Sequence, residues 1–317
     1  MLGNMRPADA IFILGVTPRS GTNYLSALLC SHPDCGPARE PVHEDLFLQH
    51  AHLLRAYTSA VRAAWDPGWG EFQDDLPDRL HETLGEALIS FLWVDRNRRL
   101  VTKSPSVQNL GFFFTLFPHS RLLLLIRDGR SVVQSAMSTF GWDFDTAARL
   151  WADGAEEIQR FDETHNGSGL PYCIVRYEDL VTAMEPTMTE ILDFLGLDRE
   201  RFDFTVAAQQ PVLGSSVFGR GRSAVSWEPV AKDASFAPLD RWQAWEPRTH
   251  ERFEWIGGNS LRYFGYEATS ARPTSTLWPL RQRLLDGRWR TRRLARQAKY
   301  WSLRRLAGIG TRRREGG

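Results

Sequence analysis

Cysteine and lysine are scarce in this chain of 317 residues, and it contains no long apolar run. The three cysteines, Cys30, Cys35 and Cys173, are an odd number without the spacing of a metal-binding motif, so we expect neither a disulfide framework nor a metal cluster. No run of about 18 apolar residues occurs, which predicts that no helix crosses a membrane. The apolar run at residues 10–16 is too short for the core of a secretion signal. These absences favour a cytoplasmic globular protein that binds no metal.

Acidic residues are scarce near one end of the chain. Residues 271–317 contain 14 Arg or Lys against 2 Asp or Glu, whereas residues 1–270 contain 25 against 36, although the net charge is only +1. We therefore expect an α/β domain over residues 1–270 and a basic, Arg- and Trp-rich helical tail over residues 271–317. Gly287 is expected to interrupt one helix of this tail.

Tryptophan and leucine alternate with arginine in the tail, as around Trp278, Trp289 and Trp301. Aromatic residues between cations are typical of segments that lie on an anionic membrane surface, so peripheral membrane contact is our first expectation. Packing of the tail on the acidic domain would satisfy the same charges. Binding to an anionic acceptor polymer fits less well, and nucleic acid is not expected as a partner.

Apolar runs of strand length alternate with segments of helical spacing. Strands are expected at residues 10–16, 99–103, 122–126 and 172–176, and helices at about residues 24–32, 45–65, 80–93 and 186–195. This alternation predicts an α/β fold with a doubly wound parallel sheet and helices on both faces.

The first expected strand runs directly into the turn Thr17-Pro-Arg-Ser-Gly-Thr22 and then into a helix. Such a turn presents backbone N–H groups to an anion, and the helix dipole adds partial positive charge. Arg19 adds a full charge, and the hydroxyls of Ser20 and Thr22 can donate to phosphate oxygens. The ATPase P-loop requires a lysine after its second glycine, whereas Thr22 follows Gly21 here. We therefore expect a P-loop-like phosphate-binding loop of another kind.

A second anion site is predicted at the end of the apolar run 122–126. Arg127 follows this run, and an arginine there can grip a phosphate with two hydrogen bonds. Ser131 and Ser135 are four residues apart on the helix that follows, so they share one face. Ligands of open α/β sheets bind at the carboxyl ends of the strands, where both segments lie.

The two segments resemble the 5′-phosphosulfate loop and the 3′-phosphate motif of the sulfotransferases, nearest to the tyrosylprotein branch. The resemblance covers roughly residues 10–266 and implies the donor 3′-phosphoadenosine 5′-phosphosulfate (PAPS), with PAP as the product. It implies transfer of a sulfuryl group to a hydroxyl, less favourably an amine, of a small-molecule, glycan or lipid-linked acceptor. The nucleotide-binding residues that it implies are Pro18, Arg19, Ser20, Gly21, Thr22, Asn23, Arg127, Ser135, Tyr177, Arg220, Arg222 and Lys232.

The resemblance also implies catalytic residues. Glu40 lies at the distance from the phosphate loop of the catalytic glutamate of the tyrosylprotein branch, and we assign it as general base. His43 is the alternative, because the cytosolic branch uses a histidine whose pKa suits the task. Arg19 and Lys103 would stabilise charge at the leaving phosphate and the sulfuryl group, and Ser216 would donate to the bridging oxygen.

The acceptor is less constrained by the sequence, because residues 45–100 and 140–165 depart from the branches of the family. Aromatic side chains in and near these connections could line an acceptor pocket. They are Trp65, Trp69, Phe72, Trp142, Phe144 and Trp151.

Two alternatives come from other functional classes. A P-loop nucleotide kinase should have Gly-Lys-Ser/Thr, which this loop lacks, and an acidic Mg²⁺ ligand after a strand, for which Asp128 is the available residue. A non-catalytic nucleotide-binding or membrane-adaptor protein would have no need to combine Glu40, Lys103 and Arg127.

Overall fold

The computed structural model describes residues 10–66, 76–210, 212–213, 229–230, 239–267 and 277–291. The chain divides into two compact units. The first comprises residues 1–244 and 257–267, and the second comprises residues 245–256 and 268–317. The second unit thus takes in a short segment that precedes the predicted tail, and the contacts do not divide the chain at one position.

The strands and helices follow the alternation expected from the sequence. The strands are β1 (Ile11–Gly15), β2 (Cys35–Pro37), β3 (Arg99–Ser104), β4 (Arg121–Ile126), β5 (Tyr172–Arg176), β6 (Val212–Leu213) and β7 (Pro229–Val230). The α-helices are α1 (Thr22–Cys30), α2 (Ala51–Ala64), α3 (Leu76–Leu92), α4 (Phe113–Leu116), α5 (Gly129–Phe140), α6 (Phe144–His165), α7 (Tyr177–Thr182), α8 (Met184–Leu195), α9 (Phe204–Ala208) and α10 (Pro247–Tyr263).

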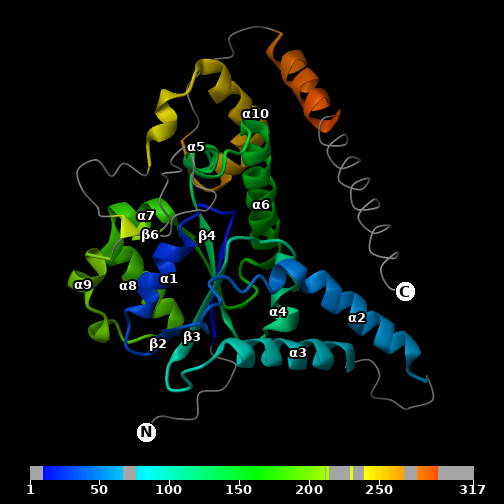
Figure 1. Cartoon of the computed structure of the whole chain (residues 1–317), viewed down its shortest axis with the longest axis vertical. Coiled ribbons are helices and arrows are strands. Elements are labelled where there is room, and N and C mark those ends of the chain that lie inside the picture. The colour runs from blue at the N-terminus through cyan, green and yellow to red at the C-terminus, as the bar shows by residue number, and fades with distance from the viewer. Residues whose placement is uncertain are drawn as a thin grey trace, which may run out of the picture. The chain divides into compact units, whose positions relative to one another are not determined.

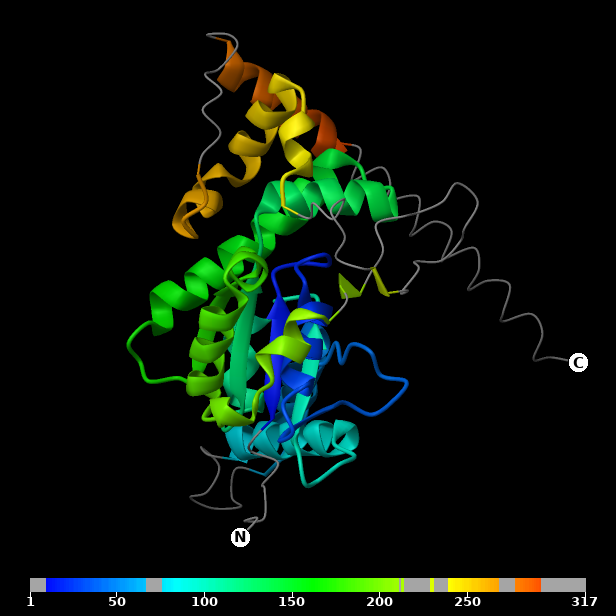
Figure 2. The ribbon, with the colours of Figure 1, turned by 90° about the vertical axis from the view of Figure 1, so that its left-hand side faces the viewer.

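Five parallel strands in the order β2-β3-β1-β4-β5 form the sheet of the first unit (Figures 1 and 2). The chain first builds one side of β1, through β2 and β3, and then crosses to the other side, through β4 and β5. The predicted doubly wound parallel sheet is therefore confirmed. Residues 122–126 of β4 are buried completely, as expected for a strand covered on both faces.

Helices cover both faces of this sheet, as predicted (Figure 1). On one face, Ile11 and Ile13 of β1 belong to the same buried cluster as Leu28 of α1 and Leu192 of α8. On the other face, the ring of Phe12 stacks on that of Phe117, just after α4, at 4.5 Å between centroids. Side chains of successive strand residues point to opposite faces, so one five-residue strand supplies both cores.

One predicted helix begins later than its apolar spacing indicated. Helix α2 starts at Ala51, not near Asp45, because Asp45 is tied to strand β3. The N–H of Asp45 donates to the carbonyl of Lys103 at 3.1 Å, and the Asp45 carboxylate accepts from the Thr102 hydroxyl at 2.7 Å. These tertiary hydrogen bonds hold residues 38–47 as a loop beside the end of β3.

The second unit contains a helix at residues 278–291 that packs against residues 245–256. Arg252 donates to the carboxylate of Asp286 at 2.8 Å, and the indole N–H of Trp255 donates to the other oxygen of that carboxylate at 3.0 Å. The prediction that Gly287 interrupts a helix is wrong, because the helix continues through it. These bonds fix the residue beside Gly287 and offset its low helix propensity. No helix in the described part of the chain is long and apolar enough to span a membrane.

Candidate functional site

The sheet topology brings the two predicted phosphate segments together. The strand order reverses between β1 and β4, which are neighbours in register with Gly15 opposite Leu125. The N–H of Val16 donates to the carbonyl of Leu125 at 3.0 Å, so the segments that follow β1 and β4 leave the sheet side by side. In open α/β sheets this reversal opens a crevice for a ligand at the carboxyl edge.

The loop after β1 is held by its own hydrogen bonds. The hydroxyl oxygen of Ser20 accepts from the N–H of Thr17 at 3.2 Å and donates to the Thr17 carbonyl. Ser20 is 1 % exposed. Its hydroxyl therefore stabilises the loop in this structure, and its donation to a phosphate stays a prediction.

Gly21 occupies a position that other residues fit poorly. Its φ is +98°, and a Cβ built there would lie 2.3 Å from the ring of Tyr177. Helix α1 then begins at Thr22 without a side-chain cap and without an acidic residue in its first turn, which contains Asn23. The N-terminus of α1 thus has the electrostatic character of an anion site. Pro18 lies in the loop that precedes this helix.

Arginines from both segments meet in the crevice. The Nε of Arg19 donates to the hydroxyl of Ser135 at 2.9 Å, and a terminal nitrogen of Arg127 donates to the Arg19 carbonyl at 2.7 Å. The guanidinium of Arg127 lies 4.4 Å from the centroid of the Tyr177 ring. Four residues predicted from separate segments, Arg19, Arg127, Ser135 and Tyr177, therefore form one cluster.

This cluster concentrates positive charge. Burial and, secondly, the nearby Arg127 lower the pKa of Arg19 to about 10, and Arg241 acts in the same direction. The positive charges of these arginines are therefore held close together in a partly buried place. A bound anion would remove this repulsion, and a phosphate has the geometry to accept from both arginines.

Asp128, the residue considered as a Mg²⁺ ligand, is engaged by an arginine. Its carboxylate accepts from the side chain of Arg130 at 2.6 Å and from the Arg130 backbone N–H at 2.8 Å, which caps α5. The Arg130 guanidinium lies 3.7 Å from the centroid of the Trp242 ring. This geometry gives Asp128 a structural role and does not favour the kinase alternative.

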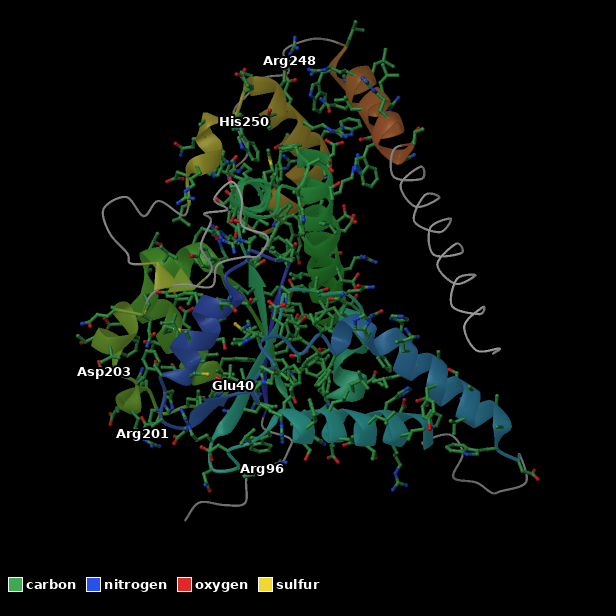
Figure 3. The ribbon with its side chains drawn as sticks, viewed as in Figure 1. Glu40, Arg96, Arg201, Asp203, Arg248 and His250 are labelled. Atoms are coloured by element: carbon green, nitrogen blue, oxygen red, sulfur yellow. The ribbon has the colours of Figure 1, made fainter. Side chains whose placement is uncertain are left out.

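A second part of the site is a cavity of about 650 Å³ beside the end of β3. It is lined by Glu40, His43 and Lys103, which were predicted for the chemical step, and by residues of α1 that include Asn23. Figure 3 labels Glu40 in the loop that follows β2, near α1. The ammonium of Lys103 donates to the His43 carbonyl, and burial lowers its pKa.

Sequence reasoning missed Asp45. Its carboxylate is buried behind the loop, where it accepts from the Thr102 hydroxyl and, at 3.0 Å, from the N–H of Phe47. Burial raises its pKa to about 6, although both hydrogen bonds and Lys103 act against the shift. An acidic pair, Glu44 and Asp45, is visible in the sequence, but nothing in it indicates which of the two is buried.

Some of the predicted site residues lie outside the described part of the chain, and others lie away from the cavity. Ser216, Arg220, Arg222 and Lys232 lie outside the described residues. Of the proposed acceptor-lining aromatics, Trp69 and Phe72 also lie outside them. Trp65, Trp142, Phe144 and Trp151 are described but do not line the cavity. Trp151 is completely buried and donates to the Arg127 carbonyl at 2.9 Å, so it supports the phosphate-side arginine from the core.

Comparison with known proteins bears on the family. A family model described as the sulfotransferase family matches residues 10–201. Protein-tyrosine sulfotransferase A of Caenorhabditis elegans is 28% identical over 257 residues, which are 76% of this chain and 62% of that protein. Protein-tyrosine sulfotransferase 1 of Danio rerio is 27% identical over 277 residues, or 81% and 72% of the two chains. The protein-tyrosine sulfotransferase of Drosophila melanogaster is 29% identical over 204 residues, but only 38% of its length is covered.

Solved structures share the fold. The sulfotransferase domain of the Synechococcus PCC 7002 olefin synthase has a TM-score of 0.50 at 20% identity, over 84% of this chain and 98% of that one. A sulfotransferase domain from the curacin biosynthetic pathway also has a TM-score of 0.50 at 20% identity, over 84% of this chain and all of that one. At this level of identity the similarity concerns the arrangement of the sheet and its helices.

Proposed function

The chain belongs to the sulfotransferase family, and from this premise we propose that it transfers a sulfuryl group from PAPS to an acceptor hydroxyl. The observation that carries the proposal is the cluster of Arg19, Arg127, Ser135 and Tyr177 at the carboxyl edge of β1 and β4. A buried arginine, Arg127, and a half-buried one, Arg19, beside a helix N-terminus suit a ligand with more than one phosphate group. The cavity with Glu40 and Lys103 supplies a separate place for the acceptor.

In the proposed reaction, an acceptor oxygen forms a bond to the donor's sulfur while the bond from sulfur to the bridging phosphate oxygen breaks. The acceptor proton passes to Glu40, with His43 as the alternative base, and PAP leaves with the electron pair of the broken bond. Arg127 and Ser135 bind a nucleotide phosphate, Tyr177 contacts the nucleotide, and Arg19 and Lys103 stabilise charge at the reacting end. The donor carries its own activated group, so the protein contributes positioning and electrostatic stabilisation.

The acceptor is proposed to be a hydroxyl compound. The names of the relatives make the tyrosine hydroxyl of a protein one acceptor of this kind, alongside small molecules, glycans and lipid-linked molecules. The chain covers 62% of the length of the C. elegans relative. Sulfation of protein tyrosines, the activity in that relative's name, is therefore only proposed for this chain. A cytoplasmic location and contact of the basic tail with a membrane surface are likewise proposals.

The test of the donor is a comparison of melting temperatures with PAP and with ATP plus Mg²⁺. A ligand that binds the folded chain at 100 times its Kd raises the unfolding free energy by about 2.7 kcal/mol. We expect PAP to raise the melting temperature without metal. Stabilisation by ATP and Mg²⁺ alone would replace the proposal with the kinase alternative.

A further inference from the structure

The wall of the cavity beside Glu40 is largely apolar. Its apolar lining residues are Ala27, Pro37, Ala38, Val42, Leu46 and Val101. Cys30 extends this wall, because burial raises the pKa of its thiol to about 11 and the group is uncharged at neutral pH. A volume of about 650 Å³ is within the range that encloses small organic ligands. The cavity therefore suits an apolar group of small-molecule size.

The charged groups of the cavity are mostly acidic. Glu40 and Glu44 both line it, and the buried carboxyl of Asp45 lies behind the same loop. Lys103 is the only lysine or arginine among the described lining residues, and it already donates to the His43 carbonyl. An acceptor with a negative charge near its hydroxyl would meet these carboxylates, and it would also approach an anionic donor. Like charges at such short range in a partly buried site oppose binding strongly.

We infer that the acceptor is an apolar alcohol or phenol without a negative charge near its hydroxyl. This inference rests on the proposed sulfuryl transfer and names the substrate class of the same site. The apolar wall selects the body of the acceptor, Glu40 takes the proton of its hydroxyl, and Glu44 excludes anionic compounds of the same size. Selection by exclusion of a competitor is a general source of specificity.

A matched pair of acceptors tests the inference. The compounds are 2-naphthol and 3-hydroxy-1-naphthoate, which share the ring and the hydroxyl and differ in one carboxylate, placed meta to the hydroxyl. With PAPS as donor, we expect kcat/KM to favour 2-naphthol by at least about tenfold. A second pair, the capped peptides Ala-Ala-Tyr-Ala-Ala and Asp-Asp-Tyr-Asp-Asp, should show the same preference for the uncharged member. Equal or better use of the anionic members would overturn the inference.

Glu44→Gln separates the charge of this residue from its size. In this variant the ratio of kcat/KM for the uncharged compound to kcat/KM for the anionic compound should fall several-fold, chiefly because kcat/KM for the anionic compound rises. Glu86→Gln on α3 is the matched control, because Glu86 is exposed and does not line the cavity. An unchanged ratio in Glu44→Gln would contradict the role given to Glu44.

Direct binding keeps the acceptor question separate from turnover. Fluorescence titration of each naphthol into the PAP-saturated protein should give the lower Kd for 2-naphthol, even if neither compound is sulfated. If PAP raises the melting temperature but the anionic compounds bind or react better, only the acceptor inference fails. If PAP does not bind, the proposed function fails and the inference fails with it.

Discussion

Among single residues, Glu40 and His43 compete for the role of base, since both line the acceptor cavity. Glu40→Gln should abolish turnover with little effect on PAP affinity, because a base acts in the chemical step and not in donor binding. Steady-state rates together with PAP titrations measure both effects. An active Glu40→Gln protein and an inactive His43→Ala protein would move the assignment to His43.

Arg127 should have the opposite profile. It is 7 % exposed and contacts both Tyr177 and the loop carbonyl of Arg19. Arg127→Ala should weaken PAP binding by about 2–5 kcal/mol, as truncation of buried charge partners does. Arg121→Ala, at the opposite end of β4, is the control and should leave PAP affinity unchanged in the same calorimetric titration. Equal losses in both variants would contradict a direct role for Arg127.

The raised pKa of Asp45 predicts that the free energy of unfolding depends on pH. Its pKa is about 6 in the folded chain and about 4 in an unfolded one, so between these values the unfolded state binds fewer protons. The stability that protonated Asp45 contributes is complete below pH about 4 and is lost as the pH rises through about 6, a change of about 3 kcal/mol.

Asp45→Asn cannot ionise and should lack this loss. Urea unfolding at pH 4 and pH 7 should show the variant gaining stability relative to the wild type as the pH rises. Asp153→Asn is the control, because Asp153 is exposed on α6. A constant difference between Asp45→Asn and wild type across this range would contradict the raised pKa.

At the scale of elements, the junction between β1 and α1 depends on one glycine. In Gly21→Ala the new methyl group would enter the Tyr177 ring, whose displacement would also disturb the stacked Arg127. Gly141→Ala is a matched control, because Gly141 also has a positive φ, +65°, but nothing lies within 4 Å of its added Cβ.

Both substitutions place alanine in the left-handed region, which costs about 1–2 kcal/mol. Only Gly21→Ala should in addition weaken PAP binding, by about tenfold or more, since a loss of about 1.4 kcal/mol corresponds to tenfold. Thermal unfolding and PAP titration of the two variants separate the effects. Unchanged PAP affinity in Gly21→Ala would show that the contact with Tyr177 does not shape the nucleotide site.

The fold was largely predictable at the level of these elements, because strand, turn and helix signals are local. Strand β5 has the predicted bounds, and α8 ends before Gly196, whose φ of +65° suits glycine at a helix end. The start of α2 was not predictable, since Asp45 is held by Thr102 and Lys103, far away in the sequence.

For the whole molecule, the described part of the tail packs on residues 245–256 within the second unit. Arg252 is 5 % exposed and is paired with Asp286 and Gln282. Truncation after Ser270 removes both partners, so the melting temperature should fall while stabilisation by PAP persists. Differential scanning calorimetry with and without PAP measures both quantities.

Membrane contact is tested with the same truncated chain. Cosedimentation with anionic vesicles should retain the full chain and lose the truncated one, because each basic residue near an anionic surface contributes about 1 kcal/mol. Vesicles of neutral lipid serve as the control. A full chain that does not sediment with anionic vesicles would contradict membrane contact and leave the packing of the tail within the second unit as its role.

The sequence by itself determined the two phosphate-binding segments, since each is a continuous strand, turn and helix start whose chemistry is readable from a few neighbouring residues. It also determined the parallel sheet, through apolar runs that must be covered on both faces. Only the tertiary structure decided that the Ser20 hydroxyl is engaged within its own loop, that Asp45 is buried, and that α1, the loop after β2 and the end of β3 enclose one acidic, apolar-walled cavity. The physical reason is that burial and charge environment arise from contacts between residues far apart in the chain, and a local pattern carries no record of which distant groups will displace the water around it.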